Sequence, residues 1–181
     1  QTRWNQTPRI PKTSVLGHCF FVAVITLLLS RDNKVKMSER RIVNNFFCGL
    51  FHDLPEAVTR DIISPVKQAT DELPSIVKRI EDEIVNKELV PLMEDFYSKE
   101  LMYFISDEFA NRIVTDDFSS KEVSFEDLNN LYNDDKYFPI DGKIVRIADH
   151  LSALLEADIS IKHGITSSHL ELGRTGMLKA Y

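Results

Sequence analysis

His52 and Asp53 are adjacent at the end of an apolar run, and Glu56, Thr59 and Asp61 follow within eight residues of Asp53. Neighbouring side chains at a helix end point about 100° apart, so this pair does not normally bond to each other. Both side chains can instead reach one metal ion that lies beyond the helix end. Neutral imidazole and carboxylate together suit a divalent ion such as Mn, Co, Fe, Ni or Zn. The pair therefore predicts part of a metal site.

His18 and Asp149 are the candidates for the remaining ligands. His18 begins an apolar run, and Asp149 flanks an apolar stripe rather than opposing it. A carboxylate beside such a stripe faces partly inward, where a charge is costly without a partner. The four groups would offer two nitrogens and two oxygens, with water in the remaining positions. The alternative is that each His is a hydrogen-bonded core residue and that Asp149 pairs with Arg146 or His150.

Helices must position these groups, because the apolar residues recur every three or four positions. The chain holds only 6 Gly and 7 Pro, which argues against a turn-rich all-β fold. Residues 1–13 read as a loop or extended arm, and residues 115–139 as an acidic, Asn-rich insertion with weak structure of its own. We predict an all-α fold. Ser14 would cap a helix over residues 14–30, and Ser38 a second helix over residues 38–53. Further helices are predicted from Pro74 onward, with a break at Pro91, within residues 100–114, and from near Asp141 onward.

The composition indicates one soluble globular domain of 181 residues, with 43% hydrophobic and 28% charged residues. A net charge of −6 argues against a nucleic-acid polymer as partner. Cys19 and Cys48 lie in apolar runs and read as buried free thiols in a reducing compartment. The longest apolar run, from Cys19, is too short to span a bilayer and predicts a buried core helix. The chain starts at Gln1 rather than Met, and we expect both ends to be trimmed.

The order His18, His52–Asp53 and Asp149 resembles that of the HD-domain metal-dependent phosphohydrolases. Within them, the chain resembles the bacterial 5′-deoxynucleotidase branch through "RW" at residues 3 and 4, "HDLPEAVTRDI" from His52, and the "SPVK" that follows. The resemblance covers most of the chain and implies a single helical HD domain over residues 1–181. Two features depart from the branch: a longer gap between Asp53 and Asp149, and "SVLGH" without an acidic residue before the first His. The second departure concerns substrate details rather than metal binding.

The resemblance implies catalytic roles for Asp53 and Glu56. Glu56 follows His52 by four residues, so on a continuing helical turn it would lie above the metal. There it would orient or deprotonate the attacking water, or protonate the leaving sugar oxygen. The alternative is a solvated first-turn carboxylate beside Pro55, which is a good first helical residue.

Substrate contacts are predicted for four further residues. Arg3 can bind a phosphoryl group in a bidentate manner, and Trp4 can stack on or wall the sugar or base. The alternative is that both belong to a frayed terminus. Asp61 and Thr59 are candidates for contacts to the sugar; the alternative for Asp61 is that it caps a helix or turn. Lys67 is a weaker candidate on the phosphate side.

The sequence thus predicts a metal-dependent phosphohydrolase that releases phosphate from nucleoside 5′-monophosphates, with deoxyribonucleotides expected. The alternatives are an HD phosphohydrolase for a triphosphate, cyclic nucleotide or alarmone, or a non-catalytic helical metal-binding module. More highly charged substrates need several Lys or Arg near the metal, and the motifs offer few. We expect a cytoplasmic homodimer with a small-molecule nucleotide substrate and no membrane partner.

Overall fold

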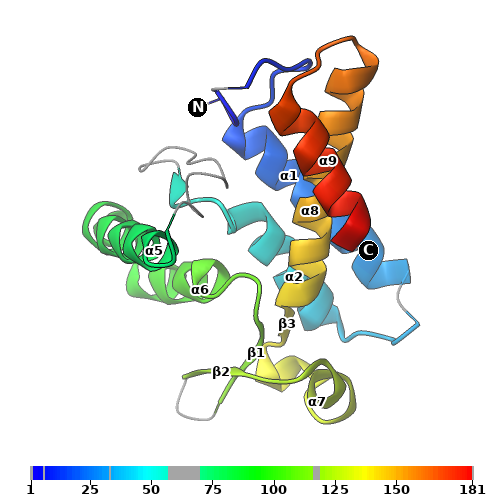
Figure 1. Cartoon of the computed structure of the whole chain (residues 1–181). Coiled ribbons are helices and arrows are strands. Elements are labelled where there is room, and N and C mark those ends of the chain that lie inside the picture. Colours follow the sequence, from blue (N-terminus) through cyan, green and yellow to red (C-terminus); the bar gives the residue numbers. More distant parts are fainter. Residues whose placement is uncertain (1, 6, 33, 57–69, 116–118, 181) are drawn as a thin grey trace.

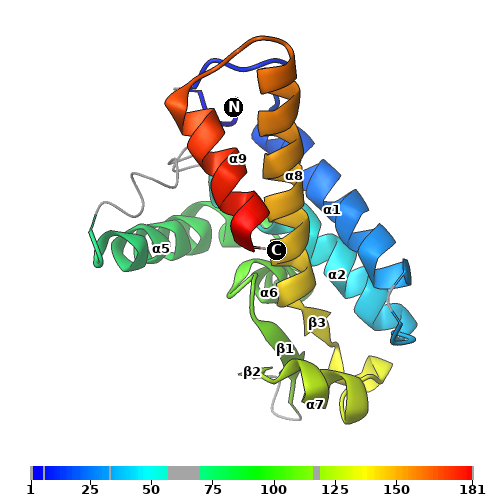
Figure 2. The same cartoon turned by 45° about the vertical axis from the view of Figure 1, so that its right-hand side comes forward.

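The computed structural model describes residues 2–5, 7–32, 34–56, 70–115 and 119–180 of the chain. Three helices form its centre: α1 (Val15–Asp32), α2 (Glu39–Phe51) and α8 (Gly142–Lys162). α1 packs against both α2 and α8, and α9 (Ser168–Ala180) runs alongside α8 (Figures 1 and 2). The predicted all-α fold class is confirmed, although α9 was not predicted.

Two serines cap the first two helices as the sequence predicted. The backbone N–H of Gly17 donates to Ser14 Oγ at 2.9 Å, and that of Arg41 donates to Ser38 Oγ at 3.3 Å. α1 and α2 then approach closely at Gly49, where an added Cβ would lie 3.1 Å from Ala23 Cα. This contact sets the two helices together just before His52. The core around it contains Val22, Ile25, Cys48, Phe104, Ile140, Val145 and Ala148.

α5 (Leu73–Ile84) and α6 (Asp95–Ile105) lie to one side of the central helices (Figure 1). The helix predicted from Pro74 is present, and the break predicted at Pro91 falls within a short 3₁₀ turn, Val90–Leu92. A π-helical turn, Val85–Leu89, precedes it. Proline lacks the N–H that would continue the helical ladder, which explains why the helix ends here.

The helix predicted over residues 100–114 is wrong in its second half. α6 ends at Ile105, and β1 (Asn111–Val114) follows as the central strand of a small antiparallel sheet, between β2 (Ser120–Glu122) and β3 (Ile140–Asp141). The buried Arg112 stabilises the connection because its guanidinium donates to carbonyl oxygens at both ends of the turn: those of Tyr103, Phe104, Asp107 and Ala110.

The weak structure predicted for residues 115–139 is also wrong for the part that the structure describes. This segment carries β2, α7 (Phe125–Asn130) and a 3₁₀ turn, Asp135–Tyr137. Arg41 of α2 holds this segment against the central helices, because its guanidinium donates to Asn129 Oδ1 at 2.8 Å and to Asn133 Oδ1 at 3.1 Å. A basic partner that lies 88 and 92 residues away in sequence cannot be inferred from local composition. The status of the segment as an insertion remains a prediction.

The apolar run from Cys19 was expected to be too short to span a bilayer, but the whole of α1 is longer than that run. Among the described residues, α1 is the one helix that is long and apolar enough to cross a membrane. This criterion rests on length and composition alone, and a core helix of a globular protein also meets it. Within the fold, 44% of α1 is buried, including His18, Cys19 and Val22. These buried positions agree with the predicted core helix.

Candidate metal centre

Three central helices bring together the four residues that the sequence singled out as ligands. His18 lies in the first turn of α1, His52 and Asp53 follow the end of α2, and Asp149 lies on α8. His18 Nε2 lies 3.1 Å from Asp149 Oδ1 and 3.5 Å from Asp53 Oδ2. His52 Nε2 lies 3.3 Å from Asp53 Oδ2 and 3.9 Å from Asp149 Oδ1. Two imidazoles therefore face two carboxylates across one small space.

The other nitrogen of each imidazole is already engaged. His52 Nδ1–H donates to the Gly49 carbonyl at 2.8 Å, so the neutral ring carries its lone pair on Nε2. His18 Nδ1 lies 3.1 Å from Ser152 Oγ, one turn beyond Asp149 on α8. Both Nε2 atoms are buried, and within the described ranges neither has a hydrogen-bond partner. This arrangement is what a metal-ligating histidine needs, because a hydrogen bond at one nitrogen orients the lone pair of the other.

The carboxylates stay ionised in this environment. Burial raises the pKa of Asp53, but the imidazoles of His52 and His18 and the Arg3 guanidinium outweigh it and hold the pKa below its usual range. The pKa of Asp149 is also lowered, because His18 and His52 outweigh the effect of burial. Burial lowers the pKa of His52, but the nearby Asp53 and Asp149 carboxylates raise it to about 9. The cluster thus attracts a cation, whether a proton or a metal ion.

The site is closed behind the imidazoles and open beside the carboxylates. The side chains of His18 and His52 are 0% and 1% exposed, whereas those of Asp53 and Asp149 are 22% and 21% exposed. A divalent ion of the Mn-to-Zn series accepts such a mixed nitrogen and oxygen set. The residues present therefore fit the metal that the sequence predicted, with an open side for water or substrate.

Cys19 lies beside this cluster, although the sequence indicated only a buried thiol. Its Sγ, a ring nitrogen of His52 and a carboxylate oxygen of Asp53 all lie within 4.8 Å of one another. Burial and the carboxylates of Asp53 and Glu56 raise the pKa of the Cys19 thiol to about 12. The thiol therefore stays protonated at neutral pH.

Glu56 is buried in the turn that follows the His52–Asp53 pair. Its backbone N–H donates to the Asp53 carbonyl at 3.1 Å, so the chain continues in a turn after Asp53. Glu56 is 7% exposed, which disagrees with the alternative of a solvated carboxylate. Its catalytic role remains a prediction. Thr59, Asp61 and Lys67, the other candidates from this stretch, lie outside the described residues.

Arg3 and Trp4 belong to an arm that folds onto α8, so the frayed-terminus alternative is wrong. Arg3 is 7% exposed, and its NH1 donates to Glu156 Oε2 at 2.6 Å. Its NH2 lies 3.7 Å from Asp149 Oδ1, at the edge of the candidate metal centre. The Trp4 ring centre lies 4.4 Å from the Arg3 guanidinium carbon, so the indole packs on the cation. Glu156 was not among the predicted site residues, although its position two helical turns after Asp149 places it on the same face of α8.

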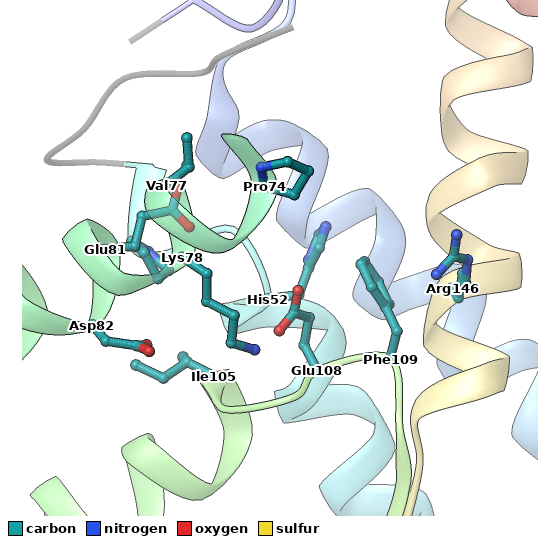
Figure 3. A pocket seen from close by; sticks show the side chains of 11 residues that line it. His52, Pro74, Val77, Lys78, Glu81, Asp82, Ile105, Glu108, Phe109 and Arg146 are labelled. Atoms are coloured by element: carbon teal, nitrogen blue, oxygen red, sulfur yellow. The ribbon is translucent and has the colours of Figure 1, made fainter. Parts of the chain in front are cut away.

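A cavity of about 380 Å³ adjoins the site on the α5 and α6 side. Figure 3 shows Phe109 between His52 and Arg146, which projects from α8. The Arg146 guanidinium carbon lies 5.5 Å from the Phe109 ring centre, so Arg146 packs on Phe109. This packing disagrees with the alternative in which Arg146 pairs with Asp149. Charged residues that line the cavity also include Lys78, Glu81, Asp82 and Glu108.

Comparisons with known proteins identify the family. Over 75 residues the chain is 36% identical to a dATP triphosphohydrolase of Acinetobacter phage SH-Ab 15497, a match that spans 37% of this chain and 36% of that protein. The fold of this chain is similar to that of an HD-domain phosphohydrolase from Listeria innocua, with a TM-score of 0.71 and 18% sequence identity. The match covers 98% of this chain and 71% of the Listeria protein. The sequence profile described as "HD domain" matches residues 1–176. The chain therefore belongs to the HD domain family.

Proposed function

We propose that the protein is a metal-dependent phosphohydrolase that releases phosphate from nucleoside 5′-monophosphates, with deoxyribonucleotides as the expected substrates. One observation carries the proposal: two buried Nε2 atoms without hydrogen-bond partners among the described residues face two ionised carboxylates within 3.1–3.9 Å. We assign His18, His52, Asp53 and Asp149 as the ligands of one divalent transition-metal ion. The assignment to the 5′-deoxynucleotidase branch is part of this proposal.

A divalent ion held by these residues would lower the pKa of a water and polarise a phosphoryl oxygen, which is the chemistry that phosphate-ester hydrolysis requires. The chain itself would supply the remaining functions. Glu56, buried one turn after His52, would accept the proton of the attacking water or donate one to the leaving sugar oxygen. Arg3, held at the edge of the site, would bind the anionic phosphoryl group. Asp61, Thr59 and Trp4 remain candidates for sugar or base contacts.

The charges of the described residues around the site favour a monophosphate. Among the residues that the structure describes within 2–56 and 70–180, the lining of the cavity beside His52 has the carboxylates of Glu81, Asp82 and Glu108 and the cations of Lys78 and Arg146. Lys78 is already paired with Asp107 at 2.8 Å. A triphosphate brings more negative charge and would need additional cations to offset it.

A deoxynucleoside triphosphate is the second candidate substrate. It is supported by the 36% identity to a phage protein named as a dATP triphosphohydrolase. The aligned stretch covers 36% of that protein, so its substrate comes to this chain only as a hypothesis.

One assay distinguishes these candidates. The purified protein is stripped with chelator, reloaded with Mn, Co, Ni, Fe, Zn or Mg, and incubated with dAMP, dTMP, AMP and dATP. Chromatography of the products separates nucleoside plus phosphate from nucleoside plus tripolyphosphate. The proposal predicts phosphate release from a deoxynucleoside monophosphate with a transition metal, and its loss in Asp53→Ala. Exclusive turnover of dATP would favour the second candidate.

A non-catalytic metal-binding module predicts a different result in the same assay. Such a module would bind the ion and turn over none of the nucleotides, with or without Asp53. The buried Glu56, which follows Asp53 by three residues, supports the enzyme, because a structural metal site has no need of this carboxylate. A homodimeric state and a cytoplasmic location remain predictions, which gel filtration with light scattering and cell fractionation would test.

A further inference from the structure

Glu156 of α8 forms ion pairs with two arginines of the N-terminal arm, Arg3 and Arg9. Its Oε2 accepts from Arg3 NH1 at 2.6 Å and lies 3.0 Å from Arg9 NH1. Arg3, Arg9 and Glu156 are 7%, 4% and 9% exposed, so this is a buried charge cluster rather than a solvated surface pair. A buried ion pair is weak evidence for stability, because the loss of hydration offsets the attraction. The cluster therefore calls for another explanation.

The position of Glu156 on α8 connects the arm to the candidate metal centre. Asp149 and Glu156 are two helical turns apart and share one helix face, and Arg3 spans the interval between them. The arm is fixed again one turn further along, where Ser160 Oγ accepts from the Ile10 N–H at 3.2 Å and donates to the Ile10 carbonyl at 3.1 Å. The face of α8 that carries Asp149 thus also carries the attachment of the arm.

The arm is also tied to itself around Arg3. Arg9 NH2 donates to the Arg3 carbonyl at 2.7 Å, and the Arg3 N–H donates to the Thr13 carbonyl at 2.9 Å. The Trp4 ring centre lies 4.4 Å from the guanidinium carbon of Arg3 and 5.1 Å from that of Arg9. Backbone, aromatic and carboxylate contacts therefore all restrict the Arg3 side chain.

We propose that Glu156 is a positioning residue that, together with Arg9, holds the Arg3 guanidinium beside Asp149 as a preformed binding group for the substrate phosphoryl anion. The inference rests on the proposed phosphohydrolase function and assigns to Glu156 a role that acts through Arg3. An arginine that is already ordered loses less side-chain entropy when it binds an anion. Without Glu156, the nearest carboxylate left for Arg3 among these contacts is Asp149, so the cation would turn toward a proposed metal ligand.

Trp4 provides a direct probe of this arm, because it is the only tryptophan in the chain and packs on both guanidinium groups. Inorganic phosphate is titrated into metal-loaded protein, and the Trp4 fluorescence gives its Kd. Steady-state kinetics with dAMP are measured on the same samples. Glu156→Gln keeps the shape of the side chain but removes its charge. We expect phosphate to bind about tenfold more weakly and KM to rise by a similar factor, with a smaller change in kcat.

Asp158→Asn is the matched control. Asp158 lies on the same helix, but it pairs with Lys162 at 2.7 Å and Arg174 at 2.9 Å, away from the arm. This variant loses the same charge and should keep the phosphate Kd and KM of the wild type within about twofold. A control that weakens phosphate binding as much as Glu156→Gln does would overturn the inference, because net charge alone would then explain the effect.

A double-mutant cycle with Arg3→Ala separates positioning from general structural support. If Glu156 acts through Arg3, Glu156→Gln adds less than about twofold to the phosphate Kd of Arg3→Ala. Fully additive effects would contradict that coupling. If Glu156→Gln fails to fold, as judged by circular dichroism, Arg9→Met replaces it in the same cycle with the same expectation.

The two proposals fail in different ways. Metal-dependent turnover that survives Glu156→Gln with an unchanged phosphate Kd overturns the positioning role and leaves the phosphohydrolase intact. Wild-type protein that binds metal but neither binds phosphate nor hydrolyses any nucleotide overturns both.

Discussion

Arg41 and Asp141 form a bidentate ion pair that is completely buried and joins α2 to the start of α8. Arg41 Nε donates to Asp141 Oδ2 at 2.7 Å, and Arg41 NH2 donates to Oδ1 at 2.6 Å. Asn45 completes the carboxylate shell, because its Nδ2 donates to Asp141 Oδ2 at 2.9 Å. The pair fixes the relative placement of the two helices that contribute His52 and Asp149.

Replacing one member of this pair should destabilise the protein strongly. Asp141→Asn leaves Arg41 as a buried charge without its counter-ion, and we expect the free energy of unfolding to fall by about 3–5 kcal/mol. Urea unfolding followed by circular dichroism measures this change. Lys162→Met, which breaks an exposed pair with Asp158, should cost less than about 1 kcal/mol. An equal decrease in the free energy of unfolding for the two variants would contradict the prediction that the buried pair contributes more than the exposed one.

Glu56 should be needed for turnover but not for metal binding. Glu56→Gln retains the size of the side chain and removes the proton acceptor, so we expect kcat to fall by about 10²–10⁴-fold. The metal content of the purified variant, measured by mass spectrometry, should match that of the wild type. Glu171→Gln on α9 is the control and should remain fully active. A fully active Glu56→Gln would refute the assigned role.

The two cysteines should react slowly in the folded protein and rapidly once it unfolds. Both are buried and free, and burial raises the pKa of Cys48 as well as that of Cys19, whose pKa is about 12. The thiolate is the reactive form, so at pH 8 the folded protein offers little of it. Ellman's reagent should react slowly with the native chain, faster as pH rises toward 12, and with two thiols in denaturant. Immediate reaction of a native thiol at pH 8 would contradict this burial.

Local signals predicted most of the helices that carry the candidate site. Ser14 and Ser38 provide cap hydrogen bonds within three residues, and the apolar repeats around His18 and Asp149 have the helical period. These signals act over one or two turns, which explains why the centre of the fold was predictable. The metal-site hypothesis also drew on the family resemblance, because adjacent His and Asp residues alone do not specify which helices converge.

Contacts between distant segments account for what the sequence analysis missed. β1 was predicted as helix because its residues are compatible with either state, and pairing with β2 and β3 decides between them. Gly142, which lies against the Ala110 backbone, permits that pairing, since a side chain there would collide with Ala110. Glu156 was missed for a similar reason, because its partner Arg3 is 153 residues away.

Metal content per chain tests the central claim most directly. Stripped protein is loaded with Mn²⁺ or Co²⁺, desalted and measured by mass spectrometry, in the wild type, in His52→Ala and in a control, His163→Ala, which changes an exposed histidine at the end of α8. We predict one ion per chain in the wild type and in His163→Ala, and a loss of most of the bound ion in folded His52→Ala. A wild-type chain that binds no ion, or a His52→Ala chain that keeps a full one, would contradict the account.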